Sequence, residues 1–191
     1  MNFCYGSQDG LLWPILEQIF ETNLDYEPTA SAIEQRKQLL TQHQIGICDI
    51  VESCYRDKID ASDLGMQDVT LRSLLKIISE HSTVTTLLLM GGNSKNGPEY
   101  FLRKLLKTHK IALHEESSHH PKQHSFEILN SQGASRKIFV VSLISPSGSA
   151  NRAIGSHELY KKRKRESNAY TTVQYRIDQY RDYFKKRHFI D

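Results

Sequence analysis

The sequence predicts an α/β fold with a mainly parallel sheet. Two apolar runs, at residues 84–90 and 139–144, have the length of strands and are rich in valine, leucine and isoleucine. Because both runs are mainly apolar and do not alternate with polar residues, they predict strands buried on both faces, as in parallel sheets. A predicted helix at residues 96–108 lies between them, and the order strand, helix, strand favours a right-handed crossover.

Amphipathic spacing predicts the other helices. The first begins near Leu11, and its buried stripe consists of Leu11, Leu12, Ile15, Leu16, Ile19 and Phe20. Thr29 or Ser31 begins a second helix, since either hydroxyl can cap its first turn. A third helix is predicted at residues 70–81, with an inward face formed by Leu71, Leu74, Leu75 and Ile78. The last, at residues 173–184, places aromatic side chains inward and cations outward.

Two segments between these helices are less regular. Residues 45–56 mix apolar and polar side chains, which predicts a short strand or loop that presents Asp49, Glu52 and Ser53. Residues 59–67 are predicted to form a surface loop.

Residues 114–124 hold four histidines, His114, His119, His120 and His124. Their spacing fits no common zinc-ligand pattern and Pro121 interrupts it, so we expect a solvated loop and no metal site. The stretch 126–144 contains two apolar runs around a polar turn, which predicts a hairpin.

The second strand of this hairpin leads into the most informative stretch, Ser145-Pro-Ser-Gly-Ser-Ala-Asn151, followed by Arg152. Ligands of open α/β sheets bind beyond the carboxyl ends of strands, where this serine loop is expected. Serine hydroxyls, a glycine that permits close approach and a guanidinium fork all suit a phosphate. The residues alone are equally compatible with an ordinary turn between a strand and a helix.

The serine loop resembles the second catalytic motif of the uracil-DNA glycosylase superfamily, in particular its mismatch-specific uracil and deoxyinosine branches. Two further stretches resemble that family in the same order. Residues 5–16, Tyr-Gly-Ser-Gln-Asp-Gly-Leu-Leu-Trp-Pro-Ile-Leu, resemble the segment that opens its first helix. Residues 45–56 resemble its next pocket segment. The resemblance covers most of the chain.

This resemblance implies a three-layer α/β/α sandwich that flips a deaminated base, uracil or hypoxanthine, out of DNA and hydrolyses its N-glycosidic bond. Such an enzyme is a DNA base-excision repair hydrolase, and it requires no metal or other cofactor. The implied DNA-binding residues are Ser145, Pro146, Ser147, Gly148, Ser149, Asn151 and Arg152. The implied base pocket is formed by Tyr5, Gly6 and Ser7, with Asp49 and Ser53 opposite.

The chain also departs from the family. The family's first strand and first catalytic loop precede the Tyr5 segment, whereas Met1 stands two residues before Phe3, so both are expected to be missing. In the deoxyinosine branch, an asparagine three residues before the tryptophan is the catalytic amide, and this chain has Gly10 there. Asp9 is the candidate catalytic base in its place. We therefore expect weak activity or none.

Composition is typical of a globular protein that stays outside membranes and needs no disulfides. The chain has 191 residues, three cysteines and no apolar run of membrane-spanning length. We expect one domain at residues 1–191, a monomer in the cytoplasm, with a basic C-terminal segment at residues 158–191. Residues 1–160 carry 15 Lys and Arg against 18 Asp and Glu, whereas residues 161–191 carry 10 against 4. This asymmetry suits a polyanion such as DNA, or a solubilising tail.

Three functions stay open on the sequence. The first is an active DNA glycosylase, and the second is a relative that binds DNA without catalysis. The third is an unrelated α/β enzyme that binds a nucleotide and shares only the strand and loop pattern.

Overall fold

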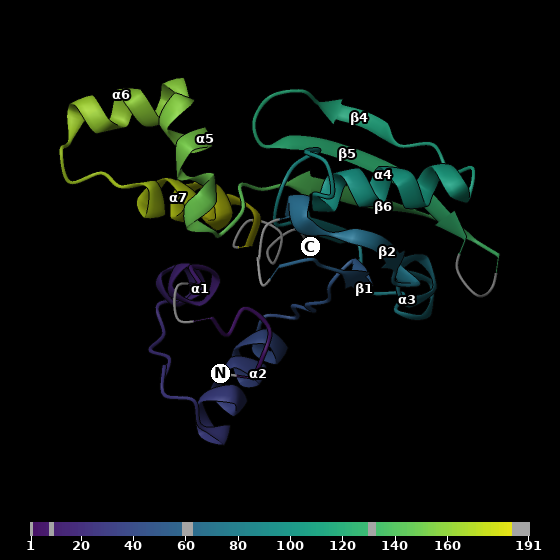
Figure 1. Ribbon diagram of the computed structural model, residues 1–191, viewed down its shortest axis with the longest axis horizontal. Coiled ribbons are helices and arrows are strands. Elements are labelled where there is room, and N and C mark those ends of the chain that lie inside the picture. Colours follow the sequence, from purple (N-terminus) through teal and green to yellow (C-terminus); the bar gives the residue numbers. More distant parts are fainter. Residues whose placement is uncertain (1, 8–9, 59–62, 130–132, 185–191) are drawn as a thin grey trace. The chain divides into compact units, whose positions relative to one another are not determined.

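A computed structural model describes residues 2–7, 10–58, 63–129 and 133–184 of the chain, which divides into two compact units (Figure 1). Unit 1 combines the two ends of the sequence, Met1–Ile47 and Ser145–Asp191. Unit 2 is the continuous stretch Cys48–Ile144. That the units act together as one domain stays a prediction.

The regular elements of unit 1, within its described residues, are all helices or helical turns. Its elements are α1 (Leu12–Phe20), α2 (Ala30–Gln42), the 3-10 turn η2 (Gly148–Ala150), α5 (Asn151–Ser156), α6 (Glu158–Glu166) and α7 (Thr172–Phe184). The predicted capping hydroxyl of α2 is that of Thr29, which accepts a hydrogen bond from the Ala32 amide at 3.1 Å. The first predicted helix and the last are both confirmed.

The core of unit 1 joins helices from opposite ends of the sequence. Ile15 and Ile19 of α1 are fully buried, and so are Ile177 and Tyr180 of α7. The rings of Phe20 and Phe184 meet edge to face at 6.1 Å between centroids. Trp13 is also buried, and its indole NH donates to the Cys4 carbonyl at 2.9 Å.

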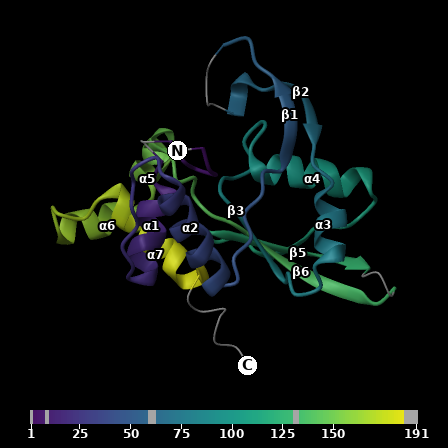
Figure 2. The ribbon, with the colours of Figure 1, turned by 90° about the horizontal axis from the view of Figure 1, so that it is seen from below.

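Unit 2 contains both helices and strands. In chain order its elements are β1 (Val51–Tyr55), η1 (Asp63–Gly65), β2 (Gln67–Leu71), α3 (Leu74–Glu80), β3 (Thr86–Leu89), α4 (Pro98–Thr108), β4 (His114–Ser117), β5 (Lys122–Leu129) and β6 (Ser135–Ser142). β1 and β2 form an antiparallel pair (Figure 2). The other strands form a sheet in the order β3-β6-β5-β4. The α/β class is confirmed.

The prediction of a mainly parallel sheet is wrong, because the four-stranded sheet is mixed. β3 and β6 are parallel, whereas β6 pairs antiparallel with β5, and β5 with β4. β5 and β6 form the hairpin that the sequence predicts, and a short turn can only join antiparallel strands. The long apolar run of β6 thus reflects burial on both faces, not parallel neighbours alone.

Helices α3 and α4 pack on the same face of this sheet. Alternate residues of β5 and β6, namely Phe126, Ile128, Ile138 and Val140, form one core cluster with side chains of both helices. The helices contribute Leu74, Ile78, Leu102 and Leu106. Unit 2 by itself therefore has two layers, and the three-layer sandwich remains a prediction.

Two local predictions need correction. The solvated loop predicted at residues 114–124 is wrong in part, because residues 114–117 form β4, residues 122–124 begin β5 and His124 is only 2% exposed. Residues 118–121 lie between the strands, and His114, His119 and His120 are exposed. Pairing with the neighbouring strand outweighs the polar composition of this segment. The helix predicted at residues 70–81 begins only at Leu74, and Leu71 belongs to β2, which also occupies the end of the loop predicted at 59–67.

A buried polar network links α4 to the sheet of unit 2. Glu99 is 1% exposed and accepts hydrogen bonds from the Ser142 hydroxyl at 2.7 Å and from Arg103 at 2.8 Å. Arg103 also donates to Nε2 of His124 at 2.7 Å, so the imidazole is neutral and carries its proton on Nδ1. This network ties β5 and β6 to one helix.

Candidate functional site

The serine loop leaves the sheet at the end of β6 and enters unit 1, as the sequence predicts. Ser147 caps the η2 turn, since its hydroxyl accepts a hydrogen bond from the Ser149 amide at 3.2 Å. The Ser147 and Ser149 hydroxyls lie 2.8 Å apart. Pro146 is buried, whereas Gly148 and Ser149 are exposed. The loop is therefore buried at Pro146 and exposed to solvent at Gly148 and Ser149.

The shape of this loop depends on Arg176, a residue that sequence reasoning missed. Arg176 lies on α7 and its side chain is 0% exposed. Its guanidinium donates to the Ser145 carbonyl at 2.9 Å and to the Ser147 carbonyl at 2.6 Å. The same group donates to the Asn151 side-chain oxygen at 2.9 Å. One buried cation therefore holds both ends of the serine loop.

A signal for Arg176 is present in the sequence. It falls on the apolar stripe of the last helix, one residue before Ile177 and four before Tyr180. A charged residue on such a stripe must find polar partners inside the protein, since burying an unpaired charge is very unfavourable. The stripe alone does not say which segment supplies those partners.

The Tyr5 segment and the serine loop meet in unit 1. The Leu11 amide donates to the Pro146 carbonyl at 3.2 Å, which joins the start of α1 to the loop. Just before it, the Gly6 amide donates to the Phe3 carbonyl at 2.9 Å, and the Gly10 amide to the Ser7 carbonyl at 3.0 Å. Two of the three stretches that resemble the glycosylase family are thus in contact.

Tyr5 occupies an unusual backbone conformation at this junction. Its φ is +51°, in the left-handed region that non-glycine residues seldom adopt, and the residue is 37% exposed. Strained backbone of this kind is often found at binding sites.

The turn that follows leaves little space at Gly10. A Cβ atom at Gly10 would lie 3.0 Å from the Tyr5 carbonyl oxygen and 3.1 Å from that of Ser7. The tight turn is therefore built around a glycine.

The other predicted site residues are distributed as follows. Asn151 and Arg152 are exposed at the start of α5, in unit 1 with the serine loop. Asp49 and Ser53 are exposed in unit 2, where Ser53 lies on β1 and the Asp49 carbonyl accepts a hydrogen bond from Arg72 at 3.0 Å. Asp9 lies outside the described residues. A base pocket shared by these groups stays a prediction.

Helix α6 presents the basic run at residues 161–165. None of its residues is buried, yet it is held firmly to the rest of unit 1 on one side. Arg163 pairs with Asp178 of α7 at 2.7 Å, and Tyr160 packs edge to face on Tyr175 at 5.8 Å. Lys162 and Arg165 of the same helix are exposed. The arrangement displays fixed positive charge beside α5.

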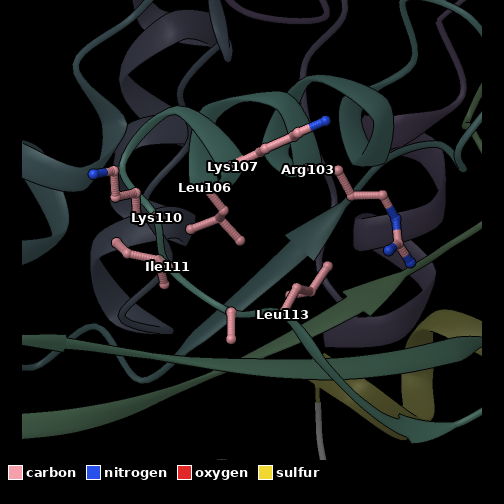
Figure 3. A pocket seen from close by; sticks show the side chains of 7 residues that line it. Arg103, Leu106, Lys107, Lys110, Ile111 and Leu113 are labelled. Carbon is pink, nitrogen blue, oxygen red and sulfur yellow. The ribbon is translucent and has the colours of Figure 1, made fainter.

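A shallow hollow of about 380 Å³ lies elsewhere, at the end of α4 in unit 2 (Figure 3). Aliphatic side chains of Leu106, Ile111 and Leu113 line it, with Arg103, Lys107 and Lys110 around them. None of the residues that the sequence predicts for the site lies in this hollow. Its cations also fit the end of a helix, where positive charge interacts favourably with the dipole.

Comparison of the chain with protein-family models, with curated proteins and with solved structures finds no match. None of the helices in the described ranges has the length and hydropathy needed to cross a membrane. Within those same ranges, no group of three or more His, Cys, Asp or Glu side chains is arranged to hold a metal ion.

Proposed function

We propose that this protein is a DNA-binding, glycosylase-like protein that acts on uracil or hypoxanthine flipped out of duplex DNA. The observation that carries the proposal is the hydrogen bond between Leu11 and Pro146, which brings the Tyr5 segment against the serine loop. In the glycosylases that the chain resembles, the corresponding segments form the base pocket and the DNA grip. A chance resemblance gives no reason for two distant stretches to meet.

Each group has a role that fits its setting. The Ser147 and Ser149 hydroxyls and the loop backbone bind a phosphate of the damaged strand, and the exposed Arg152 binds a neighbouring one. Tyr5 is 37% exposed, and its ring is the proposed surface on which the flipped base stacks. Hydrolysis passes through a cationic sugar, and a positioned water completes it. Asp9 is the proposed group for that water.

Binding without efficient catalysis is the second candidate, and the Gly10 turn favours it. The carbonyl oxygens of Tyr5 and Ser7 crowd the place of any Cβ at position 10. The backbone is thus adapted to glycine, which has no amide with which to orient water. A protein of this kind would recognise damaged DNA and turn it over slowly.

Replacing Arg152 with alanine is expected to weaken binding to any duplex and to reduce the salt dependence of that binding. Each phosphate contact releases counterions, so the slope of log K against log salt should fall by about 0.9 for one lost contact. Fluorescence anisotropy at salt concentrations from about 50 to about 200 mM measures the slope. The matched control is Lys37→Ala, an exposed cation of α2 that pairs with Glu34.

Salt-independent binding by the wild-type chain would remove DNA from this proposal. If Arg152→Ala keeps the wild-type slope and affinity, Arg152 does not contact a phosphate. The exposed cations Lys162 and Arg165 of α6 would then be the first residues to test for phosphate contacts.

Replacing Ser147 with alanine is expected to lower excision from duplex DNA more than excision from a single strand. The loop is proposed to hold the backbone of a duplex while a base is extruded, a step that a single strand largely avoids. Loss of a hydrogen bond to a charged group should reduce the duplex rate by about tenfold or more. Single-turnover assays on matched uracil substrates measure both rates, and equal losses would place Ser147 in the base pocket.

A further inference from the structure

We propose that the buried guanidinium of Arg176 places a positive charge behind the serine loop and makes the loop a preformed binding site for a phosphate group. The inference rests on the proposed function insofar as that phosphate belongs to DNA. The site itself requires only the contacts of Arg176, the exposed loop and the absence of a counterion among the described residues.

The first step concerns the partners of the guanidinium. Arg176 donates to three carbonyl oxygens, those of Ser145, Ser147 and Thr172, and to the amide oxygen of Asn151. All of these acceptors are neutral. Within the described ranges, no carboxylate forms an ion pair with Arg176. The hydrogen bonds are satisfied, but the positive charge is not neutralised.

A comparison within unit 1 shows that this placement is specific. Arg36 is also buried, at 1% exposed, and donates to the carbonyls of Asp25 and Ala32. Its guanidinium lies 5.3 Å from the Trp13 ring and 5.1 Å from the Tyr26 ring, whose faces attract a cation. Arg36 therefore stabilises packing among aromatic rings, whereas Arg176 lies under an exposed polar loop.

The second step concerns the orientation of the loop. Because the Ser145 and Ser147 carbonyls point inward to Arg176, the loop turns its negative ends away from solvent. The middle of the loop, Gly148 and Ser149, is exposed, and the Ser149 hydroxyl lies 2.8 Å from that of Ser147. Donors on the outer surface and a buried cation behind them attract the same ligand, an oxyanion.

The third step concerns the ligand. A single phosphate matches the size of a loop of a few residues with a charge beneath it. That phosphate can be a phosphodiester of DNA or the phosphate of a free nucleotide, since both present the same oxygens. Duplex DNA must also be accommodated by the surface around the loop, whereas a free nucleotide need not be. Binding of duplex DNA and of a nucleoside monophosphate can therefore be measured separately.

The direct test titrates the protein with inorganic phosphate, then with a nucleoside monophosphate, and follows backbone amide resonances by NMR. We expect inorganic phosphate at millimolar concentration to shift the amides of residues 147–150 and to leave those around Arg36 unchanged. Glycerol, which offers hydroxyls without charge, should shift neither. No response of residues 147–150 to phosphate overturns the proposal.

The variant test separates charge from shape. Arg176→Gln keeps some hydrogen bonding but removes the charge, so duplex affinity should fall by about tenfold or more and the salt slope by about 0.9. Arg176→Lys keeps the charge and should retain the wild-type slope even if affinity falls. Arg36→Gln removes an equally buried guanidinium from the same unit and should leave the slope unchanged.

The outcomes distinguish this proposal from the proposed function. A wild-type slope in Arg176→Gln, with the variant folded by circular dichroism, means that Arg176 acts through shape alone and overturns the proposal while DNA binding stands. Phosphate and nucleotide binding that depend on Arg176, without duplex binding, support the site and exclude DNA as its ligand. If Arg176→Gln fails to fold, the proposal is still tested by the phosphate titration of the wild-type protein and by the salt slope of Arg176→Lys.

Discussion

Replacing Gly10 with asparagine is expected to raise the rate of uracil or hypoxanthine excision by about two orders of magnitude. The wild-type chain has no side chain at the position where the glycosylases that it resembles carry an amide. Groups that position water or act as general bases typically contribute 10²–10⁴ in rate, on the order of what an added amide could restore. Because a Cβ at position 10 would lie 3.0 Å from the Tyr5 carbonyl oxygen and 3.1 Å from that of Ser7, the gain requires a small shift of this turn.

Gly10→Ala is the matched control, because it introduces the same Cβ without an amide. It should leave the rate at or below that of the wild type. Asp9→Asn should lower the wild-type rate if the Asp9 carboxylate has taken over the role of the amide. Single-turnover kinetics on uracil and inosine duplexes measure all of these. A robust wild-type rate that survives Asp9→Asn contradicts this assignment and makes Asp49 the next residue to test.

Replacing Glu99 with alanine is expected to destabilise unit 2 by about 3 kcal/mol. This value is the low end of the range for removing one partner of a buried ion pair, since the side chain of Glu99 is 2% exposed but that of Arg103 is 38% exposed. The change leaves Ser142 and Arg103 without their shared acceptor inside the protein. For a protein of this size, the melting temperature should fall by roughly 6–12 °C. Differential scanning calorimetry measures the loss. The control is Glu80→Ala, which breaks only an exposed pair with Lys76 and should change little.

The same network predicts that acid destabilises unit 2. Burial, followed by the charge of Arg103, lowers the pKa of His124. As the pH falls, the unfolded chain therefore binds a proton at His124 before the folded chain does, and the free energy of unfolding decreases below about pH 6.5. Burial raises the pKa of Glu99, but hydrogen bonds from Ser142 and Arg103 outweigh it, so the pKa lies below its ordinary value. The stability from Glu99 is present above that ordinary pKa and is lost as the pH falls through the lowered one.

Melting curves at pH 7.5 and pH 5.0 test whether acid lowers the melting temperature, as expected. His124→Gln, whose side chain can still accept from Arg103, should reduce the difference between the two curves. A melting temperature that rises on acidification would contradict the neutral state assigned to His124.

Sequence reasoning predicted the elements whose signals are local. The helix α4 begins where Gly97 and Pro98 indicate, and β3 lies within the apolar run at residues 84–90. The hairpin of β5 and β6 follows from two apolar runs around a polar turn. In each of these, the residues that determine the structure are neighbours in the chain.

The features that were missed depend on partners far away in the sequence. β4 is polar and lies at the edge of the sheet, so it lacks the apolar alternation that marks a strand, and its pairing with β5 decides its structure. Likewise, three of the four acceptors of Arg176, on Ser145, Ser147 and Asn151, stand between 25 and 31 positions before it in the chain. The serine loop was identified from its composition, but its shape required the fold.

The division of the chain has a consequence for the order in which the protein is made. Unit 2 is continuous, so it can fold as soon as it leaves the ribosome. Unit 1 needs both ends of the sequence, because α1 packs with α7 through Phe20 and Phe184. Arg176 lies on that last helix. The serine loop is therefore synthesised before the residue that shapes it, and a nascent chain gains its proposed phosphate site only after α7 has been made.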